Sequence, residues 1–214
     1  MFYKTCDKQR KNKKMNIRFS ANQNDALYNT KYLQLKKAKS PNGKSDWVYA
    51  HRPNAKDVVV IAPVIHSKDG DSVVFIETER PPIKAEGKAD RCIELPAGLV
   101  GDENSAEETE QALVKELLEE TGYKPDKITI QGKNIASSPG CTSETSTIAI
   151  ADINQDTLSQ RPITDGGVIK AIYKVPLKEL SKWLGEQQAK GKAVSAQALS
   201  GLYFVLSRLH ADSN

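Results

Sequence analysis

The feature that most constrains this chain is a short acidic run at residues 115–123, which reads KELLEETGY. On a helix, Glu116 and Glu120 lie one turn apart on the same face, and Glu119 lies close to that face. Carboxylates at this spacing repel each other, and a sequence that concentrates them usually has a cation to offset the repulsion. Clustered carboxylate oxygens suit Mg²⁺ or Mn²⁺ and do not suit zinc. The run therefore predicts a rigid helix that presents a divalent-metal site.

The acidic run belongs to a longer stretch whose charge opposes that of the whole chain. Residues 102–120 contain eight acidic residues and one base, Lys115, whereas the chain has a net charge of +4. An acidic stretch in a basic protein is typical of a metal site that faces an anionic substrate. A solvated acidic helix face is the alternative that the carboxylates alone leave open.

Residues at fixed distances extend this pattern in both directions. Five residues separate Gly101 from Glu107, and seven more precede the Lys115-Glu116 pair; a second pair of glutamates and then Gly122 complete the pattern. It resembles the Nudix box, with one departure, because Lys115 occupies a position where the family has arginine. Lysine lacks the flat, two-pronged donor of arginine, but we expect Lys115 to hold a neighbouring carboxylate in place.

Local signals indicate how this segment folds. Gly101 allows a turn at backbone angles that other residues avoid. Ser105 is the predicted N-cap of a helix that runs to Thr121, and Gly122 ends it in the left-handed conformation. The apolar stripe of this helix consists of Ala112, Leu113, Leu117 and Leu118. Such a loop–helix–loop would hold the metal-binding glutamates toward a cleft.

Composition limits the class of protein. The chain has 214 residues, of which 27% are charged and 38% hydrophobic, as is usual for one soluble domain with a modest extension. No apolar run approaches the ~18–20 residues of a membrane span, so no membrane partner is expected. Three cysteines without metal spacing favour a reducing cytoplasm over a disulfide framework.

The N-terminus carries a basic run at residues 8–14. Such a run raises the question of nucleic-acid binding. No aromatic platform or nucleic-acid motif accompanies it, so a nucleic-acid partner is not expected. We predict that residues 1–25 form a disordered basic tail.

Hydrophobic patterning predicts an α/β fold. The predicted strands are residues 32–35, 47–50, 58–65, 73–77, 92–95, 128–130, 148–153 and 169–175; the predicted helices, besides that of the acidic run, are 176–189 and 195–210. Residues 84–90 are predicted to be a loop. The Nudix resemblance implies the same architecture, an α/β/α sandwich with a mixed β-sheet and an N-terminal β-hairpin extension. We divide the chain into the tail, the hairpin at 26–56, which is the expected substrate and dimer region, and a Nudix hydrolase domain at 57–212.

Segments outside the box resemble the ADP-ribose and ADP-sugar pyrophosphatases of this family, over about residues 28–210. Residues 94–100, which read ELPAGLV, resemble a loop whose backbone carbonyl binds metal. The resemblance implies that the metal ligands are Ala97, Glu116, Glu119 and Glu120. Residues 79–82, which read ERPP, resemble a strand end whose arginine contacts the substrate diphosphate, which would be Arg80 here.

The N-terminal hairpin resembles the base-binding region of the same enzymes. The resemblance rests on Asp46-Trp47 and Arg52, and implies that Trp47 stacks on adenine with Tyr32 as a partner aromatic. Stacking contributes ~1–3 kcal/mol per base. Packing in the core or at an interface is the alternative for both aromatics. The resemblance also implies a homodimer in which the hairpin of one subunit helps to form the base pocket of the other.

The general base is the least constrained residue of the predicted site. Residues 138–144, which read SPGCTSE, resemble a family loop whose glutamate, Glu144 here, approaches the site. A catalytic glutamate is usual in the loop before the last strand, but Gly167 occupies that position in this chain. Glu119, Glu144 and Asp165 are therefore the candidates.

Together these residues predict Mg²⁺-dependent hydrolysis of the diphosphate link of ADP-ribose or a related nucleoside diphosphate sugar, giving AMP and a sugar phosphate. Three alternatives stay open. The first is a Nudix enzyme with another nucleoside diphosphate or a dinucleotide as substrate. The second is a non-catalytic Nudix module that binds ADP-ribose, and the third is RNA binding through the basic tail.

Overall fold

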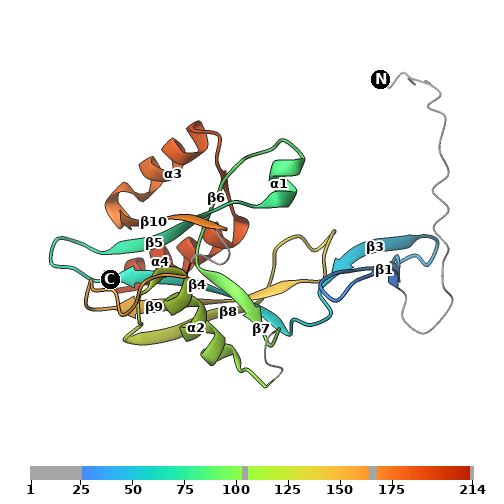
Figure 1. Cartoon of the computed structure of the whole chain (residues 1–214), viewed down its shortest axis with the longest axis horizontal. Coiled ribbons are helices and arrows are strands. Elements are labelled where there is room, and N and C mark those ends of the chain that lie inside the picture. The colour runs from blue at the N-terminus through green and yellow to red at the C-terminus, as the bar shows by residue number, and fades with distance from the viewer. Residues whose placement is uncertain (1–25, 103–105, 164–167, 213–214) are drawn as a thin grey trace.

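The computed structural model describes residues 26–102, 106–163 and 168–212. These residues form a small N-terminal sheet, which projects from a larger α/β domain (Figure 1). In the larger domain a mixed sheet lies between helices on both of its faces. The predicted sandwich architecture is therefore confirmed.

The larger sheet is built around one strand, β4. Its strands are β4 (Asp57–Ile65), β5 (Ser72–Thr78), β6 (Cys92–Glu94), β7 (Ala97–Val100), β8 (Lys127–Ala136), β9 (Thr145–Ile153), β10 (Ile169–Pro176) and β11 (Ala193–Val194). The order is β11-β6-β5-β4-β9-β8, with β10 beside β5 and β7 beside β4. The β4–β9 and β11–β6 pairs are parallel and the others are antiparallel, so the sheet is mixed.

Both faces of β4 are buried, which explains its nearly continuous apolar sequence. Because side chains alternate across a strand, Val58 and Val60 pack on one side with residues of the C-terminal helices. Val59 and Ile61 pack on the other side with the helix of the acidic run. The central strand thus fixes where that helix sits relative to the sheet.

The small sheet contains the predicted hairpin and one further strand. β2 (Gln34–Lys39) and β3 (Asp46–His51) form the hairpin, and β1 (Ala26–Asn29) pairs antiparallel with β2. Tyr32 was expected in a strand, but it lies in the bend before β2. The alternation of Leu33 and Leu35 around polar neighbours favoured an earlier strand start than the turn at Thr30 allows, since the Thr30 N–H donates to the Leu33 carbonyl.

Helices cover the two faces of the larger sheet. They are α2 (Thr109–Thr121), α3 (Leu180–Ala189), which follows a 3₁₀ turn at Leu177–Glu179, and α4 (Ala196–Asp212). α2 packs against one face of the sheet at β4, whereas α4 packs against the other face at β4 and β9, and α3 packs against β10 on that face (Figure 1). A short helix, α1 (Pro81–Ala85), follows β5 and has no buried residue. Among the helices of the described residues, none has both the length and the apolar character needed to cross a membrane.

The helix of the acidic run starts later than predicted and ends where predicted. Ser105, the expected N-cap, lies outside the described residues, and α2 begins at Thr109 with Glu108 as N-cap. The Glu108 N–H donates to Gln111 Oε1 at 3.1 Å, which satisfies one of the free groups at this end. Gly122 adopts the left-handed conformation, with a φ of 78°, and its N–H donates to the Leu118 carbonyl.

Two further boundaries differ from the prediction because of proline. Part of the expected loop at 84–90 is helical, since α1 begins at Pro81, where the fixed φ of proline suits the first helical turn. Pro176 was expected to begin a helix. It instead ends β10 opposite Ser72, with extended backbone angles that proline also accepts at a strand end.

Candidate active site

Most of the predicted site residues line one cavity of about 600 Å³. Those that line it are Arg52, Arg80, Ala97, Glu116, Glu119, Glu120 and Glu144. They come from the segment after β3, the residue before α1, β7, α2 and the residue before β9, so the fold brings together positions far apart in sequence. Trp47 and Tyr32 do not line this cavity. Asp165 lies outside the described residues.

The first two residues of β7 and the last turns of α2 lie in close contact at the cavity wall. Glu116 lies directly against Gly98, because a Cβ at position 98 would be 2.0 Å from Glu116 Cδ. One turn later, Glu120 Oε2 accepts a hydrogen bond of 2.9 Å from the Ala97 N–H. Only a glycine at position 98 allows this approach, which holds both carboxylates beside the backbone of Ala97.

Burial changes the acidity of these two glutamates. It raises the pKa of Glu116 to about 7, with the charge of Glu119 adding to the effect. It raises the pKa of Glu120 to about 8, although the hydrogen bond from Ala97 acts in the opposite direction. The positive charges of Lys115, near Glu116, and of Arg80, near Glu120, lower these pKa values but do not offset the burial. A cation in the cavity would supply further positive charge.

The donor set fits a magnesium ion without a complete protein cage. Among the described residues, no three His, Cys, Asp or Glu side chains gather closely enough to hold an ion by themselves. Mg²⁺ commonly takes one or two carboxylates and completes its shell with water and substrate oxygens. Two buried carboxylates next to a backbone segment and a cavity of about 600 Å³ match that requirement.

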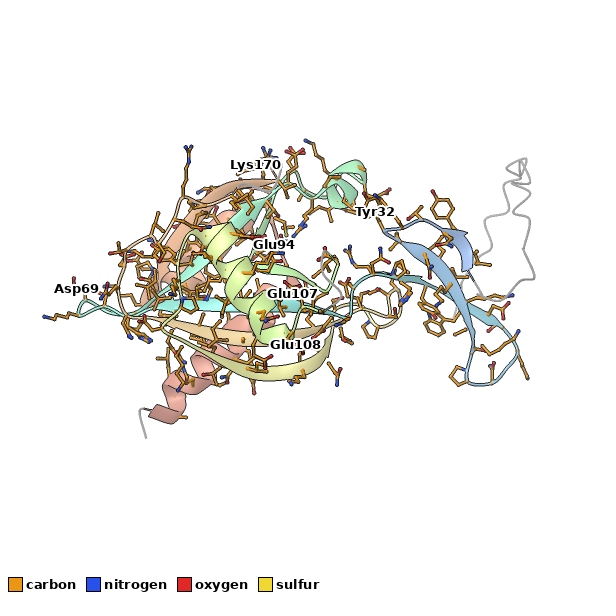
Figure 2. All side chains as sticks on the ribbon, turned by 60° about the horizontal axis from the view of Figure 1, so that its bottom comes forward. Tyr32, Asp69, Glu94, Glu107, Glu108 and Lys170 are labelled. Carbon is orange, nitrogen blue, oxygen red and sulfur yellow. The ribbon has the colours of Figure 1, made fainter. Side chains whose placement is uncertain are left out.

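A second set of contacts fixes the loop that precedes α2. Gly101 has a φ of 81°, which favours glycine, and its N–H donates to Glu107 Oε2 at 3.0 Å. Lys115 Nζ lies 3.9 Å from Glu107 Oε1. The expectation that Lys115 holds a neighbouring carboxylate is thus confirmed for Glu107, one of the residues labelled in Figure 2.

Arg80 is held by a carboxylate to which the sequence pattern assigned no role. Its Nε and Nη2 donate to Glu94 Oε2 at 2.9 and 2.7 Å. The Thr78 hydroxyl donates to the same oxygen at 2.8 Å, so Glu94 is itself fixed. Both Arg80 and Glu94 line the cavity. The only sequence signal for this role was the place of Glu94 at the start of the ELPAGLV segment.

Arg52 and Glu144 were predicted separately, and the structure pairs them. Arg52 Nε lies 2.6 Å from Glu144 Oε2. The pair joins the segment after β3 to the residue before β9. It therefore forms a wall of the cavity where the N-terminal sheet meets the larger domain.

Of the two predicted base-stacking aromatics, Trp47 lies on β3 and Tyr32 lies in the bend before β2. Trp47 is 51% exposed, and its indole N–H donates to the Gly140 carbonyl at 2.8 Å. Tyr32 is 70% exposed, with Lys31 Nζ 4.6 Å from its ring centre. Figure 2 shows Tyr32 beside the N-terminal sheet, apart from Glu94 and Glu107 of the larger domain. Trp47 thus anchors β3 to the 138–144 loop and keeps part of its ring open to solvent.

The α/β/α fold, the spaced residues from Gly101 to Gly122 and the buried glutamates are features that this chain shares with a known family. The NUDIX domain matches residues 55–197, and the chain belongs to the Nudix family. The family prediction made from the acidic run and its flanking residues is confirmed.

Three curated members of this family are similar to the chain in sequence. The chain is 31% identical over 144 residues to the ADP-ribose pyrophosphatase of Saccharomyces cerevisiae, which covers 63% of this chain and 58% of that protein. It is 31% identical over 181 residues to an uncharacterised Nudix hydrolase of Schizosaccharomyces pombe, covering 78% of this chain and 82% of that one. It is 26% identical over 149 residues to the mouse ADP-sugar pyrophosphatase, covering 65% and 64%. The chain thus spans less than two thirds of the yeast ADP-ribose pyrophosphatase and of the mouse protein.

A solved structure shares the fold. The crystal structure of an ADP compounds hydrolase superposes with a TM-score of 0.55 and covers 84% of this chain and 86% of that one. The sequence identity is 18%, so this likeness shows the fold alone.

Proposed function

We propose that this protein is a Mg²⁺-dependent pyrophosphohydrolase that cleaves the diphosphate link of ADP-ribose or a related nucleoside diphosphate sugar. The products would be AMP and a sugar phosphate. The observation that carries the proposal is the pair of buried carboxylates, Glu116 and Glu120, held against β7 in a cavity that also contains Arg80. The names of the yeast and mouse relatives support the choice of substrate class.

Glu116, Glu120 and the Ala97 carbonyl would hold the metal ion, and Glu119 would contribute to a second one. A bound Mg²⁺ or Mn²⁺ would offset charge on the diphosphate and make a bound water easier to deprotonate. Besides these metal ligands, the chain would contribute a cavity wall in which the two carboxylates are fixed and largely buried. Burial of both carboxylates beside β7 supports this assignment.

Arg80 would bind the diphosphate oxygens. Glu94 occupies the Nε side of the guanidinium through Nε and Nη2. Arginine has five N–H groups in a rigid fork, so the N–H groups on the Nη1 side stay available for phosphate. Charge-assisted bonds of this kind are roughly twice as strong as neutral ones.

Glu119 is our first choice for the general base, followed by Glu144 and Asp165. Glu119 lines the cavity on the same helix as the metal-binding pair. Glu144 is bound to Arg52 at 2.6 Å, so this pair would have to open before Glu144 accepted a proton. A general base must come within hydrogen-bond reach of the water that it deprotonates.

The N-terminal sheet would contribute the nucleoside contacts and a homodimer interface. The exposed part of the Trp47 ring would stack on adenine, with Tyr32 from the same or the partner subunit. Exposed apolar side chains on this sheet, Tyr28, Leu35 and Val48, support self-association. Cys92 and Cys141 are free thiols, in keeping with a cytoplasmic location.

The direct test is hydrolysis of a panel of nucleoside diphosphate sugars and dinucleotides with and without Mg²⁺. We expect ADP-ribose to be cleaved only with metal and Glu120→Gln to lose at least about 100-fold in kcat. Glu110→Gln, on the exposed part of α2, is the matched control and should keep wild-type turnover. Near-normal Mg²⁺-dependent activity of Glu120→Gln would refute the metal assignment, and tight ADP-ribose binding without cleavage would favour a binding module.

A further inference from the structure

A second pocket, of about 290 Å³, adjoins the proposed catalytic cavity. Arg52, Val58 and Glu144 line both spaces, so the two meet at the Arg52–Glu144 pair. The remaining walls come from β2, β3 and the segment that leads into β4. The pocket therefore lies where the N-terminal sheet meets the larger domain.

The wall from the N-terminal sheet presents polar donors on one face. Lys36 of β2 pairs directly with Tyr49 of β3, so their side chains share a face of the sheet. His51, two residues after Tyr49, points to that face as well. His51 Nδ1 lies 3.0 Å from Ser143 Oγ, which ties this face to the 138–144 loop. Burial, together with the charge of Lys36, lowers the pKa of His51, so it is neutral at pH 7.

The opposite wall presents a second lysine. The Lys56 N–H donates to the Val100 carbonyl, and its side chain runs alongside Gly101, where a Cβ would lie 3.4 Å from Lys56 Cδ. Lys56 is thus anchored at the turn between β7 and α2, close to the metal-binding segment. Lys56 is an exposed residue that lines the pocket.

The charges in the pocket leave a positive excess. Two carboxylates face it: Glu144 is bound to Arg52 at 2.6 Å, and Asp57 accepts from the Thr147 hydroxyl at 2.5 Å. Lys36 and Lys56 form no ion pair with any of the residues that the structure describes. Two lysines therefore lie beside one carboxylate that is not ion-paired, in a pocket with hydroxyl and imidazole donors.

We propose that this second pocket binds a phosphate monoester on the nucleoside ribose of the substrate, in addition to the diphosphate that the main cavity binds. The protein would then prefer nucleoside diphosphate sugars whose ribose carries an extra phosphate. This proposal rests on the proposed function. If the main cavity binds the diphosphate, the wall that it shares with the second pocket places the nucleoside ribose between the two. Lys36 and Lys56 converge on the monoester, and Tyr49 and His51 add neutral donors.

The test compares the affinity of the full chain for AMP with that for adenosine 2′,5′-bisphosphate and 3′,5′-bisphosphate, by calorimetry in Mg²⁺. None of these ligands has a diphosphate link, so none is consumed. Two charge-assisted bonds predict that one bisphosphate binds at least about tenfold more tightly than AMP. In Lys36→Gln/Lys56→Gln this ratio should fall to about one.

Lys44→Gln/Lys68→Gln is the matched control, because it removes the same two charges in exposed turns, outside the residues that line the pocket. It should leave the ratio unchanged. The inference is overturned if neither bisphosphate binds the wild type more tightly than AMP, or if Lys36→Gln/Lys56→Gln and Lys44→Gln/Lys68→Gln lower the ratio equally. ADP-ribose hydrolysis is measured separately. If the bisphosphate preference depends on the two lysines but ADP-ribose is not hydrolysed, the second pocket binds the monoester and the proposed hydrolase function is rejected.

Discussion

At the scale of single residues, the site depends on one close approach between backbone and side chain. Gly98 allows the Glu116 carboxylate to lie against β7, and Glu120 is bound to the neighbouring N–H of Ala97. Glycine has this use wherever another chain segment must come within van der Waals distance of the backbone. The geometry of the two carboxylates therefore depends on a residue that carries no chemistry of its own.

Gly98→Ala tests this dependence. The added Cβ would lie 2.0 Å from Glu116 Cδ, so the side chain has to move away. A displacement of about 1 Å costs on the order of 100-fold in rate, and we expect a loss of that size in kcat/KM with a folded protein by circular dichroism. Gly185→Ala is the control, since no atom lies within 4 Å of a Cβ there. Unchanged kcat/KM in Gly98→Ala would show that Glu116 needs no fixed position.

Glu94 gives a second residue-scale prediction. Its carboxylate orients Arg80 through Nε and Nη2, and Glu94→Gln removes the charge from this pair while keeping the shape. We expect KM for ADP-ribose to rise about tenfold with a smaller change in kcat. Arg80→Lys should raise KM similarly, and the double variant should show no additive effect, because the two residues act as one unit. Additive losses would mean that Glu94 contributes independently of Arg80.

At the scale of elements, a four-residue ionic cluster joins strands and a helix at the end of β4. His66 Nε2 lies 2.9 Å from Asp152 Oδ1, and its Nδ1 lies 3.0 Å from Asp71 Oδ2. Arg208 of α4 donates to both oxygens of Asp152, at 2.7 and 3.0 Å. The cluster therefore connects β4, β5, β9 and the helix that covers one face of the sheet.

This cluster predicts a pH dependence of stability. Partial burial alone would lower the pKa of His66, but hydrogen bonds to Asp152 and Asp71 outweigh it and raise the pKa above its ordinary value. The folded state therefore binds the proton more tightly than the unfolded chain. The contribution of His66 to the free energy of unfolding is complete below a pH of about 6.5, the pKa in the unfolded chain. It is lost as the pH rises through the raised pKa of the folded state.

Urea unfolding at several pH values between about 5.5 and 8.5 measures this effect. We expect the free energy of unfolding of the wild type to fall more steeply over this range than that of His66→Gln. The difference between the two curves isolates His66 from other groups that titrate nearby. Parallel curves for the two proteins would contradict the cluster's role.

Elements with strong hydrophobic patterns were predictable from sequence, whereas most of the short ones, with the exception of β6, were not. β4 and β5 were expected within one residue of their observed bounds, because burial on both faces leaves a continuous apolar run. α1, β7 and β11 have five, four and two residues, too few to establish a period. They are held by neighbours that the sequence does not reveal.

The same distinction applies to the site. The glutamates of α2 were predictable because they lie on one helix, where sequence spacing fixes geometry. The contacts of Glu94 with Arg80 and of Trp47 with Gly140 join segments 14 and 93 residues apart. Such partners follow only from strand order and from the docking of β3 on the 138–144 loop, so their roles appear once the fold is known.

At the scale of the whole molecule, the site forms where two bodies meet. The larger domain supplies the glutamates of α2, β7 and Arg80, and the N-terminal sheet supplies Arg52 and the walls of the second pocket. β3 is fixed to the larger domain by backbone hydrogen bonds between Ala50 and both Cys141 and Ser143. We therefore propose that catalysis belongs to the larger domain and substrate selection to the N-terminal sheet.

Diffraction from crystals soaked in Mn²⁺, with data collected at the manganese edge, tests the metal site most directly. We expect an anomalous peak in the main cavity, within coordination distance of Glu116 and Glu120, which is lost in Glu120→Gln. An anomalous peak elsewhere on the surface, with both carboxylates uncoordinated, would contradict the metal assignment.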